Sequence, residues 1–193
     1  MKGKQRLVWV TLSIWIAIAG MVSAGDEADP TTTVKSLLEA VAELAKGEAA
    51  GAEMAGRITA TLDLVMICET CLRETWKTIT PAERERFVSL FREVLEKVAY
   101  PKSADFFKET SIEIEDVETE GERAEVLTVL EHPEEGMIEV GYCLRLAGDR
   151  WLIDDILLDG ISLVRDLRSQ MQKIIKEKSY DELKRRIREK LDE

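Results

Sequence analysis

The chain has 193 residues, of which 45% are hydrophobic and 34% charged, a composition typical of one folded domain with a substantial core. Its 38 acidic and 27 basic residues give a formal net charge of −11. This balance argues against nucleic-acid binding through a basic face and against docking to anionic lipid by bulk positive charge.

Residues 1–24 have the pattern of a secretory signal peptide. Three basic residues lie between positions 2 and 6, and residues 7–18 form an apolar stretch that is short for a membrane span. Small residues at 22–24 predict cleavage after Ala24, and an uncleaved anchor is the alternative. The residue directly after the cleavage site is not a cysteine, so a lipoprotein is not expected. The mature chain after Ala24 would be exported to the periplasm with a formal charge of −14, and its folded domain is expected to span residues 29–193.

The first half of the mature chain is predicted to be helical. Apolar residues recur at helical spacing over residues 34–44, 54–62, 64–76 and 87–98. Residues 31–33, three threonines, are expected to cap the first helix. Thr80 and Glu83 predict a capping box for the fourth, with Pro81 at its first position. Pro101 is expected to end that helix.

The chain then changes to strands. Four are expected between residues 111 and 158, and the third, residues 137–146, alternates strictly between apolar and polar side chains. Short turns separate the strands, so an antiparallel meander with one buried face is predicted. Gly160 ends the fourth strand, which begins at Trp151.

Two helices follow that glycine. Val164, Leu167 and Met171 form the apolar stripe of the first, and residues 180–191 form a charged final helix. The predicted fold is therefore α+β, with a curved antiparallel four-stranded sheet and helices packed on it.

Few residues offer catalytic chemistry. His132 is the only histidine and lies in a turn, where an exposed, inert side chain is expected. Asp154 and Asp155 are neighbours on a strand, so they point to opposite faces and cannot act as a facing pair. Phosphate loops, Ser/His/Asp sets and zinc spacings are absent from the sequence. We therefore expect no enzyme activity, no cofactor and no metal.

Cys68 and Cys71 form a CxxC pair inside a helical stretch. A redox pair normally begins a helix after a strand, and zinc would need two further ligands. Helical Cβ atoms three residues apart are separated by about 5–6 Å, while a disulfide needs about 3.5–4.5 Å. Structural thiols or a distorted disulfide are expected, with redox or metal roles as alternatives. Cys143, on the polar face of its strand, is expected to be unpaired.

Two segments resemble the MlaC family of periplasmic phospholipid carriers, also called the toluene-tolerance family. Residues 76–87, WKTITPAERERF, resemble the family's W-x-T-x-T-P-x-Q/E-R-x-x-F segment. Residues 148–151 with Asp155, and residues 160–164 through 168–170, resemble its closing signature. Leu167 and Met171 depart from it, since the family often has tyrosine and phenylalanine there.

The resemblance implies an NTF2-like sheet and helices that enclose an apolar cavity for acyl chains. It also implies the partners: a phospholipid ligand, an inner-membrane Mla-type ABC transporter and an outer-membrane lipid-donor complex, which together maintain outer-membrane lipid asymmetry. Each buried CH₂ contributes about 0.8 kcal/mol, so two acyl chains cost on the order of 20 kcal/mol to bring into water. A carrier must offset this cost, and an apolar cavity lining in contact with the acyl chains is sufficient to do so.

Sixteen residues are expected to line the cavity: Val65, Leu72, Trp76, Phe87, Leu90, Phe91, Val94, Ile114, Val126, Val140, Tyr142, Leu144, Ile153, Val164, Leu167 and Met171. The helix stripe at 87–98 is expected to face the third strand across it. Carriage of another apolar lipid such as a hopanoid, a thiol oxidoreductase using the CxxC pair, and an NTF2-like enzyme with an apolar substrate are the alternatives.

Overall fold

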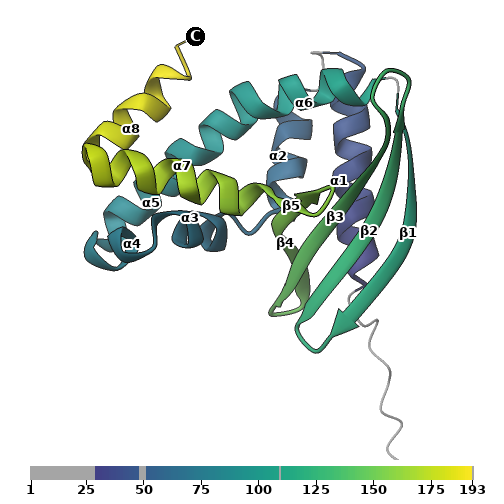
Figure 1. Ribbon diagram of the computed structural model, residues 1–193, viewed down its shortest axis with the longest axis horizontal. Coiled ribbons are helices and arrows are strands. Elements are labelled where there is room, and N and C mark those ends of the chain that lie inside the picture. Colours follow the sequence, from purple (N-terminus) through teal and green to yellow (C-terminus); the bar gives the residue numbers. More distant parts are fainter. Residues whose placement is uncertain (1–28, 48–50, 109, 193) are drawn as a thin grey trace, which may run out of the picture.

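A computed structural model describes residues 29–47, 51–108 and 110–192. Helices α1 and α2 lie against an antiparallel sheet, and α3, α4, α5, α7 and α8 gather beside it (Figure 1). The helices are α1 (Pro30–Ala45), α2 (Gly51–Thr61), α3 (Leu64–Leu72), α4 (Glu74–Thr78), α5 (Pro81–Val94), the π-helical segment η2 (Leu95–Ala99), α6 (Tyr100–Phe107), α7 (Leu163–Glu177) and α8 (Tyr180–Glu189). The expected signal peptide lies outside the described residues. Within the described part, no helix is long and apolar enough to cross a membrane.

The sheet contains five strands in sequence order, each antiparallel to the next. They are β1 (Ser111–Glu120), β2 (Arg123–His132), β3 (Gly136–Ala147), β4 (Arg150–Leu158) and β5 (Ile161–Ser162). The α+β prediction is confirmed, and the expected count of four strands is corrected by β5. Asp159 and Gly160 both have positive φ, which reverses the chain so that β5 pairs back onto β4.

Several helix boundaries differ from the predictions. Asp29, not the threonines, caps α1: its carboxylate accepts the backbone N–H of Thr31. Arg73, at φ 51°, divides the expected third helix into α3 and α4. The predicted capping box of α5 is confirmed, because Thr80 and Glu83 each accept the other's backbone N–H.

Pro101 does not end a helix, contrary to expectation. The α5 helix passes into η2, where Tyr100 N–H bonds to the Leu95 carbonyl, and α6 continues from Tyr100. Pro101 is then the second residue of α6, a first-turn position where a missing N–H costs little. The bond from Tyr100 five residues back reorients the chain before the proline. As a result, α6 continues from α5 toward the end of the molecule that holds the sheet (Figure 1).

The buried side chains form two separate apolar clusters. The sheet core joins α1 and α2 to β2, β3 and β4, and the helical core joins α3, α4, α5, α7 and α8. Leu62 and Leu95 pack against both cores. The expected arrangement, with the α5 stripe facing β3 across one cavity, is wrong. Phe87 and Phe91 of α5 lie in the helical core, whereas Val140 of β3 lies in the sheet core.

An ion pair between the buried Asp63 and the half-buried Arg145 fixes the junction between the cores. Asp63, 6% exposed, donates its backbone N–H to the Ile153 carbonyl at 2.8 Å. Its carboxylate accepts the Met66 N–H at 3.0 Å, which caps α3, and the Arg145 Nε–H at 2.6 Å. One residue therefore ties the start of α3 to both β3 and β4.

The neighbouring acids on β4 have different partners, but the simple strand alternation expected for them is interrupted. The register shifts so that Cys143 pairs with Asp155 and Leu144 with Ile153, which leaves Asp154 without a paired residue between them. Asp154 pairs with Arg123 across the sheet. Asp155 accepts the hydroxyl of Ser162 at 2.5 Å and the Val164 N–H at 3.1 Å. Because Ser162 is the N-cap of α7, Asp155 fixes the direction in which α7 leaves the sheet.

Candidate functional site

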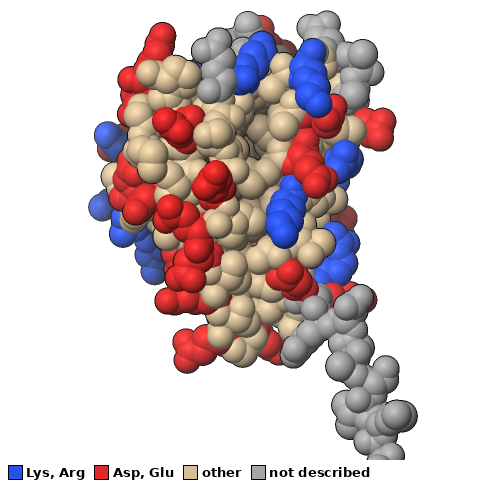
Figure 2. Space-filling view, turned by 90° about the vertical axis from the view of Figure 1, so that its right-hand side faces the viewer, with Lys and Arg blue, Asp and Glu red and all other residues tan. Residues whose placement is uncertain are grey.

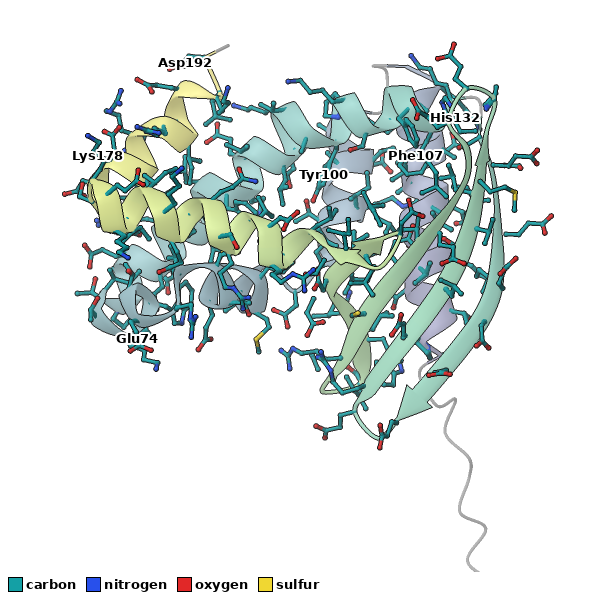
Figure 3. All side chains as sticks on the ribbon, in the orientation of Figure 1. Glu74, Tyr100, Phe107, His132, Lys178 and Asp192 are labelled. Carbon is teal, nitrogen blue, oxygen red and sulfur yellow. The ribbon has the colours of Figure 1, made fainter. Side chains whose placement is uncertain are left out.

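An apolar pocket of about 290 Å³ lies between the sheet and the helices α1, α2 and α6. Figure 3 shows Tyr100 and Phe107 of α6 on the side of that helix toward the sheet. The wall consists of Leu37, Leu38, Val41, Ile58, Leu62, Tyr100, Ser103, Phe106, Phe107, Val140, Tyr142, Ile156, Leu158 and Leu163.

The local sequence explains why the wall is apolar. Leu37, Leu38 and Val41 follow one another at helical spacing on α1, so they share the face that lies against the sheet. Val140 and Tyr142 are alternate residues of β3 and therefore point to the same inner face. The pocket is thus where the stripe of a helix and the inner face of a sheet approach without filling the space between them.

No charged side chain is among the described residues that line the pocket. Its polar groups are Ser103 and the hydroxyls of two buried tyrosines. The Tyr100 hydroxyl lies 3.3 Å from Thr59 Oγ1, which in turn donates to Glu96 at 2.9 Å. Burial raises the pKa of Tyr100 and of Tyr142 to about 12, so both phenols stay neutral near pH 7. The pocket therefore offers dispersion contacts and no fixed charge.

The mouth of the pocket carries exposed apolar residues. Phe106, Leu158 and Leu163 line the pocket and are 37%, 39% and 37% exposed. Ile161, 52% exposed, pairs with Leu158 between β5 and β4. A chain-like apolar ligand that entered here would cover surface that now contacts water.

His132 supports this rim. Its ring stacks on Phe106 with centroids 4.6 Å apart and planes 5° apart, and its Nδ1 accepts the backbone N–H groups of Glu134 and Glu135 at 3.1 Å each. The sequence predicted an exposed, inert turn residue; the side chain instead joins the β2–β3 turn to α6. Sequence reasoning also missed Phe106 as a wall residue, although two adjacent phenylalanines just after Pro101 were a usable signal.

The sixteen residues expected in the lining fall into four groups. Val140 and Tyr142 line the pocket. Ile114, Val126, Leu144 and Ile153 belong to or pack against the sheet core, and Leu72, Trp76, Phe87, Phe91, Val164, Leu167 and Met171 belong to or pack against the helical core. Val65 is 54% exposed, and Leu90 and Val94 are half-buried. As lipid contacts, these fourteen stay predictions.

The cysteine thiols are poorly placed for redox chemistry. Cys68 is 1% exposed and Cys71 is fully buried; both are free thiols within α3. Burial raises the pKa of Cys68 well above its usual range and that of Cys71 to about 11. Cys143 is half-buried, and its pKa is raised to about 11 by burial and by Glu125. A reactive cysteine needs a lowered pKa and access. Cys68 and Cys71 have neither, and Cys143 lacks the lowered pKa.

Metal chemistry also lacks a site in the described part of the chain. No group of three or more histidine, cysteine, aspartate or glutamate side chains there is arranged to hold a metal ion. The apolar pocket is therefore the candidate functional site.

Comparisons with known proteins agree with this fold. A family model described as MlaC protein matches residues 30–189. A phospholipid-binding protein from Ralstonia solanacearum, solved in complex with a phospholipid, is similar to this chain with a TM-score of 0.70 and 15% sequence identity. The similarity covers 84% of this chain and 94% of that one. No curated protein matches the sequence significantly.

Proposed function

The chain belongs to the MlaC protein family, and from this premise we propose that it is a phospholipid-binding carrier and not an enzyme. The observation that carries the proposal is the apolar pocket of about 290 Å³, which opens at Phe106, Leu158 and Leu163 and has no charged residue in its wall. The Ralstonia solanacearum protein of similar fold was solved with a phospholipid, which supports the same ligand class here.

The energetics of lipid transfer suit such a pocket. Burying one CH₂ group is favourable by about 0.8 kcal/mol, so an acyl chain held in this wall avoids most of the cost of entering water. The carrier needs no catalytic group, because the lipid is moved and not changed. The inaccessible Cys68 and Cys71 weigh against the alternative of a thiol oxidoreductase.

The location and partners are part of the proposal. We infer a periplasmic shuttle that exchanges lipid with an inner-membrane Mla-type ABC transporter and with an outer-membrane lipid-donor complex, maintaining outer-membrane lipid asymmetry. The formal charge of −11 supports docking to proteins over adsorption to anionic bilayers. Figure 2 shows a band of uncharged surface on the face that carries β1, with acidic side chains mainly along its left border and both basic and acidic side chains along its right border.

Organic-solvent extraction of the purified protein followed by mass spectrometry tests the function. We expect acyl lipid to be recovered from the wild type and from Met137→Trp, whose side chain is 69% exposed and away from the pocket wall. Leu38→Trp places an indole in the wall and should lose most of the lipid while the protein stays folded. A wild-type protein that yields no acyl lipid and binds none when it is supplied would refute the proposal.

A further inference from the structure

One edge of the sheet is open. The strand order runs from β1 to β5, so β1 pairs with β2 on one side and with no described strand on the other. It forms the outer margin of the sheet in Figure 1. The backbone N–H and C=O groups along such an edge can pair with an added strand. With ten residues, Ser111–Glu120, β1 is long enough to hold an extended segment of another chain.

The outer side of this edge strand is acidic. Five of its ten residues are aspartate or glutamate, and none is lysine or arginine. Four of the acids lie on the outer face of the sheet, because their partners on β2 alternate with the buried inner-face residues: Glu113, Asp116, Glu118 and Glu120. None of these four carboxylates forms an ion pair with a described residue. Their charge disfavours pairing with a second copy of β1 and favours a basic strand.

The cross-strand register adds a local repulsion. Glu118 lies directly opposite Glu125 of β2, and like charges in such a pair are destabilising. Both glutamates line two hollows on the outer face, of about 180 and 240 Å³. The first hollow is completed by Asp116 and by the apolar side chain of Leu127. A lysine or arginine could place its stem on the leucine and its head between the carboxylates, which would remove the repulsion.

The inner side of the same strand is uncharged. Its inward positions are Ile112, Ile114, Val117 and Thr119, whose partners on β2 are all buried. The two isoleucines are half-buried against the sheet core, and Val117 is 38% exposed. Many edge strands are protected by an inward-pointing charge, and these positions carry none. An added strand would cover Val117 if its own inward side chains were apolar.

We propose that the open edge of β1 is a docking site for an extended segment of a protein partner in which basic and apolar residues alternate. The segment would add to the sheet, with its basic side chains beside Asp116, Glu118 and Glu120. These acids lie toward the β1–β2 turn, whereas Phe106 at the pocket mouth stacks on His132 beside the β2–β3 turn, at the other end of the strands. A partner could therefore hold the protein here without covering the pocket.

Two synthetic peptides of equal composition test the pattern. One alternates arginine and valine over seven residues, and the other places its four arginines before its three valines. Both have capped ends and a fluorescent label, and anisotropy measures their binding to the purified protein. We expect the alternating peptide to bind more tightly, its affinity to fall with added salt, and amide hydrogen exchange to slow in β1. Equal affinity for the two peptides, or protection that spares β1, would overturn the proposal.

A charge reversal tests the outer side of the edge. Glu118→Lys should weaken the alternating peptide by about tenfold, because it replaces an attraction by a repulsion. The same reversal at Glu85, an exposed residue of α5, changes the net charge equally and should leave the affinity nearly unchanged. Glu118→Lys also faces Glu125 with an opposite charge, so its melting temperature should not fall. Equal affinities of the two variants would overturn the assignment of this edge.

A second pair of variants separates strand addition from charge attraction. Val117→Glu adds a negative charge on the inner side, where it should weaken the alternating peptide by blocking the edge. Val65→Glu, at a residue of α3 that is 54% exposed, adds the same charge elsewhere and should have little effect. Tighter binding by Val117→Glu would show that the peptide is held by charge alone, and strand addition would be wrong.

Two further measurements complete the test. Analytical ultracentrifugation of the wild type should show no dimer that Glu118→Lys dissociates, since such a dimer would make a second copy the occupant and overturn the basic partner. Solvent extraction should recover equal acyl lipid from Glu118→Lys and the wild type, and loss of lipid from the variant would overturn the independence of edge and pocket. A wild type that bound the alternating peptide but no lipid would refute the proposed function and support this docking site.

Discussion

Asp63 shows how one residue can hold two parts of this molecule together. It caps α3, takes part in the contact with β4 and pairs with Arg145 of β3. Its side chain is 7% exposed, so its charge depends on the arginine for compensation. The contact joins residues 82 positions apart, which no local pattern in the sequence indicates.

Removing that arginine should therefore cost more than removing a surface partner. Arg145→Met leaves the Asp63 carboxylate buried without its cation, and we expect a loss of about 3 kcal/mol in the free energy of unfolding. Lys77→Met is the control, because its pair with Glu74 is largely exposed and should contribute under about 1 kcal/mol. Urea denaturation measures both. Equal small losses would mean that Asp63 is stabilised without Arg145.

The buried thiols predict a dependence of stability on alkaline pH. Burial raises the pKa of Cys71 from 9.0 to about 11, so above pH 9 the unfolded chain loses this proton before the folded chain does. Stability contributed by the neutral thiol is present below pH 9 and is lost as the pH rises toward 11. Between pH 8 and 10 the loss should be about 1 kcal/mol for this group.

Cys71→Ala isolates that contribution. The variant is less stable at neutral pH because it loses a buried sulfur, but its free energy of unfolding should fall less between pH 8 and 10 than that of the wild type. Chemical denaturation at the two pH values gives the difference. Identical slopes would show that Cys71 titrates alike in the folded and unfolded chains.

At the scale of elements, the start of α5 is the best-determined boundary. Thr80 and Glu83 form the reciprocal bonds of a capping box, with Pro81 at the first helical position. Thr80→Ala should lower stability by about 1 kcal/mol and leave the bound lipid unchanged, because α5 belongs to the helical core. Thr78→Ala, at an exposed residue that bonds only to its own helix at the Thr75 carbonyl, should cost less. Thermal melting and lipid extraction check both variants. A changed cargo with an unchanged melting temperature would place Thr80 at the pocket.

Elements whose boundaries depend on interactions between residues close in sequence could be predicted, and elements that depend on other interactions could not. The capping box, the β3 alternation and the glycine turn after β4 are local, and each was predicted. The continuation of the helix through Pro101 was not predicted. It depends on a π-helical hydrogen bond from the Tyr100 N–H to the Leu95 carbonyl, and no sequence motif indicates that bond. The break at Arg73 likewise required a positive φ at a residue other than glycine.

The candidate site was less predictable than the fold. An apolar stripe on α5 and one on α1 look alike in sequence, yet α5 packs into the helical core and α1 borders the pocket. Which stripe meets which face is decided by contacts far apart in the chain. The family resemblance correctly indicated an α+β fold of this kind, while the assignment of wall residues needed the positions of α6 and α7.

For the whole molecule, the separation into two cores implies that stability and binding can be altered independently. The helical core packs α3, α4, α5, α7 and α8 together, and the sheet core leaves open a pocket beside α1, α2 and α6. Changes in the first should unfold the protein without selecting among ligands. Changes in the second should select among ligands with a smaller effect on folding.

Two identical substitutions test this division. Leu167 packs against the helical core and Leu38 lines the pocket, and both are half-buried. Leu167→Ala leaves a void among fixed neighbours, so we expect a loss of about 2 kcal/mol, the low end for such truncations. Leu38→Ala enlarges a space that already exists and should cost less in the ligand-free protein.

Lipid should widen the difference. With saturating lauroyl lysophosphatidylcholine, Leu38→Ala should regain stability through mass action and accept longer chains, whereas Leu167→Ala should keep its full deficit relative to the wild type under the same conditions. Urea denaturation with and without the lipid measures this. If Leu167→Ala were the milder change and altered the bound lipid, the acyl chain would lie against α7, and the pocket beside α1 and α6 would not be the binding site.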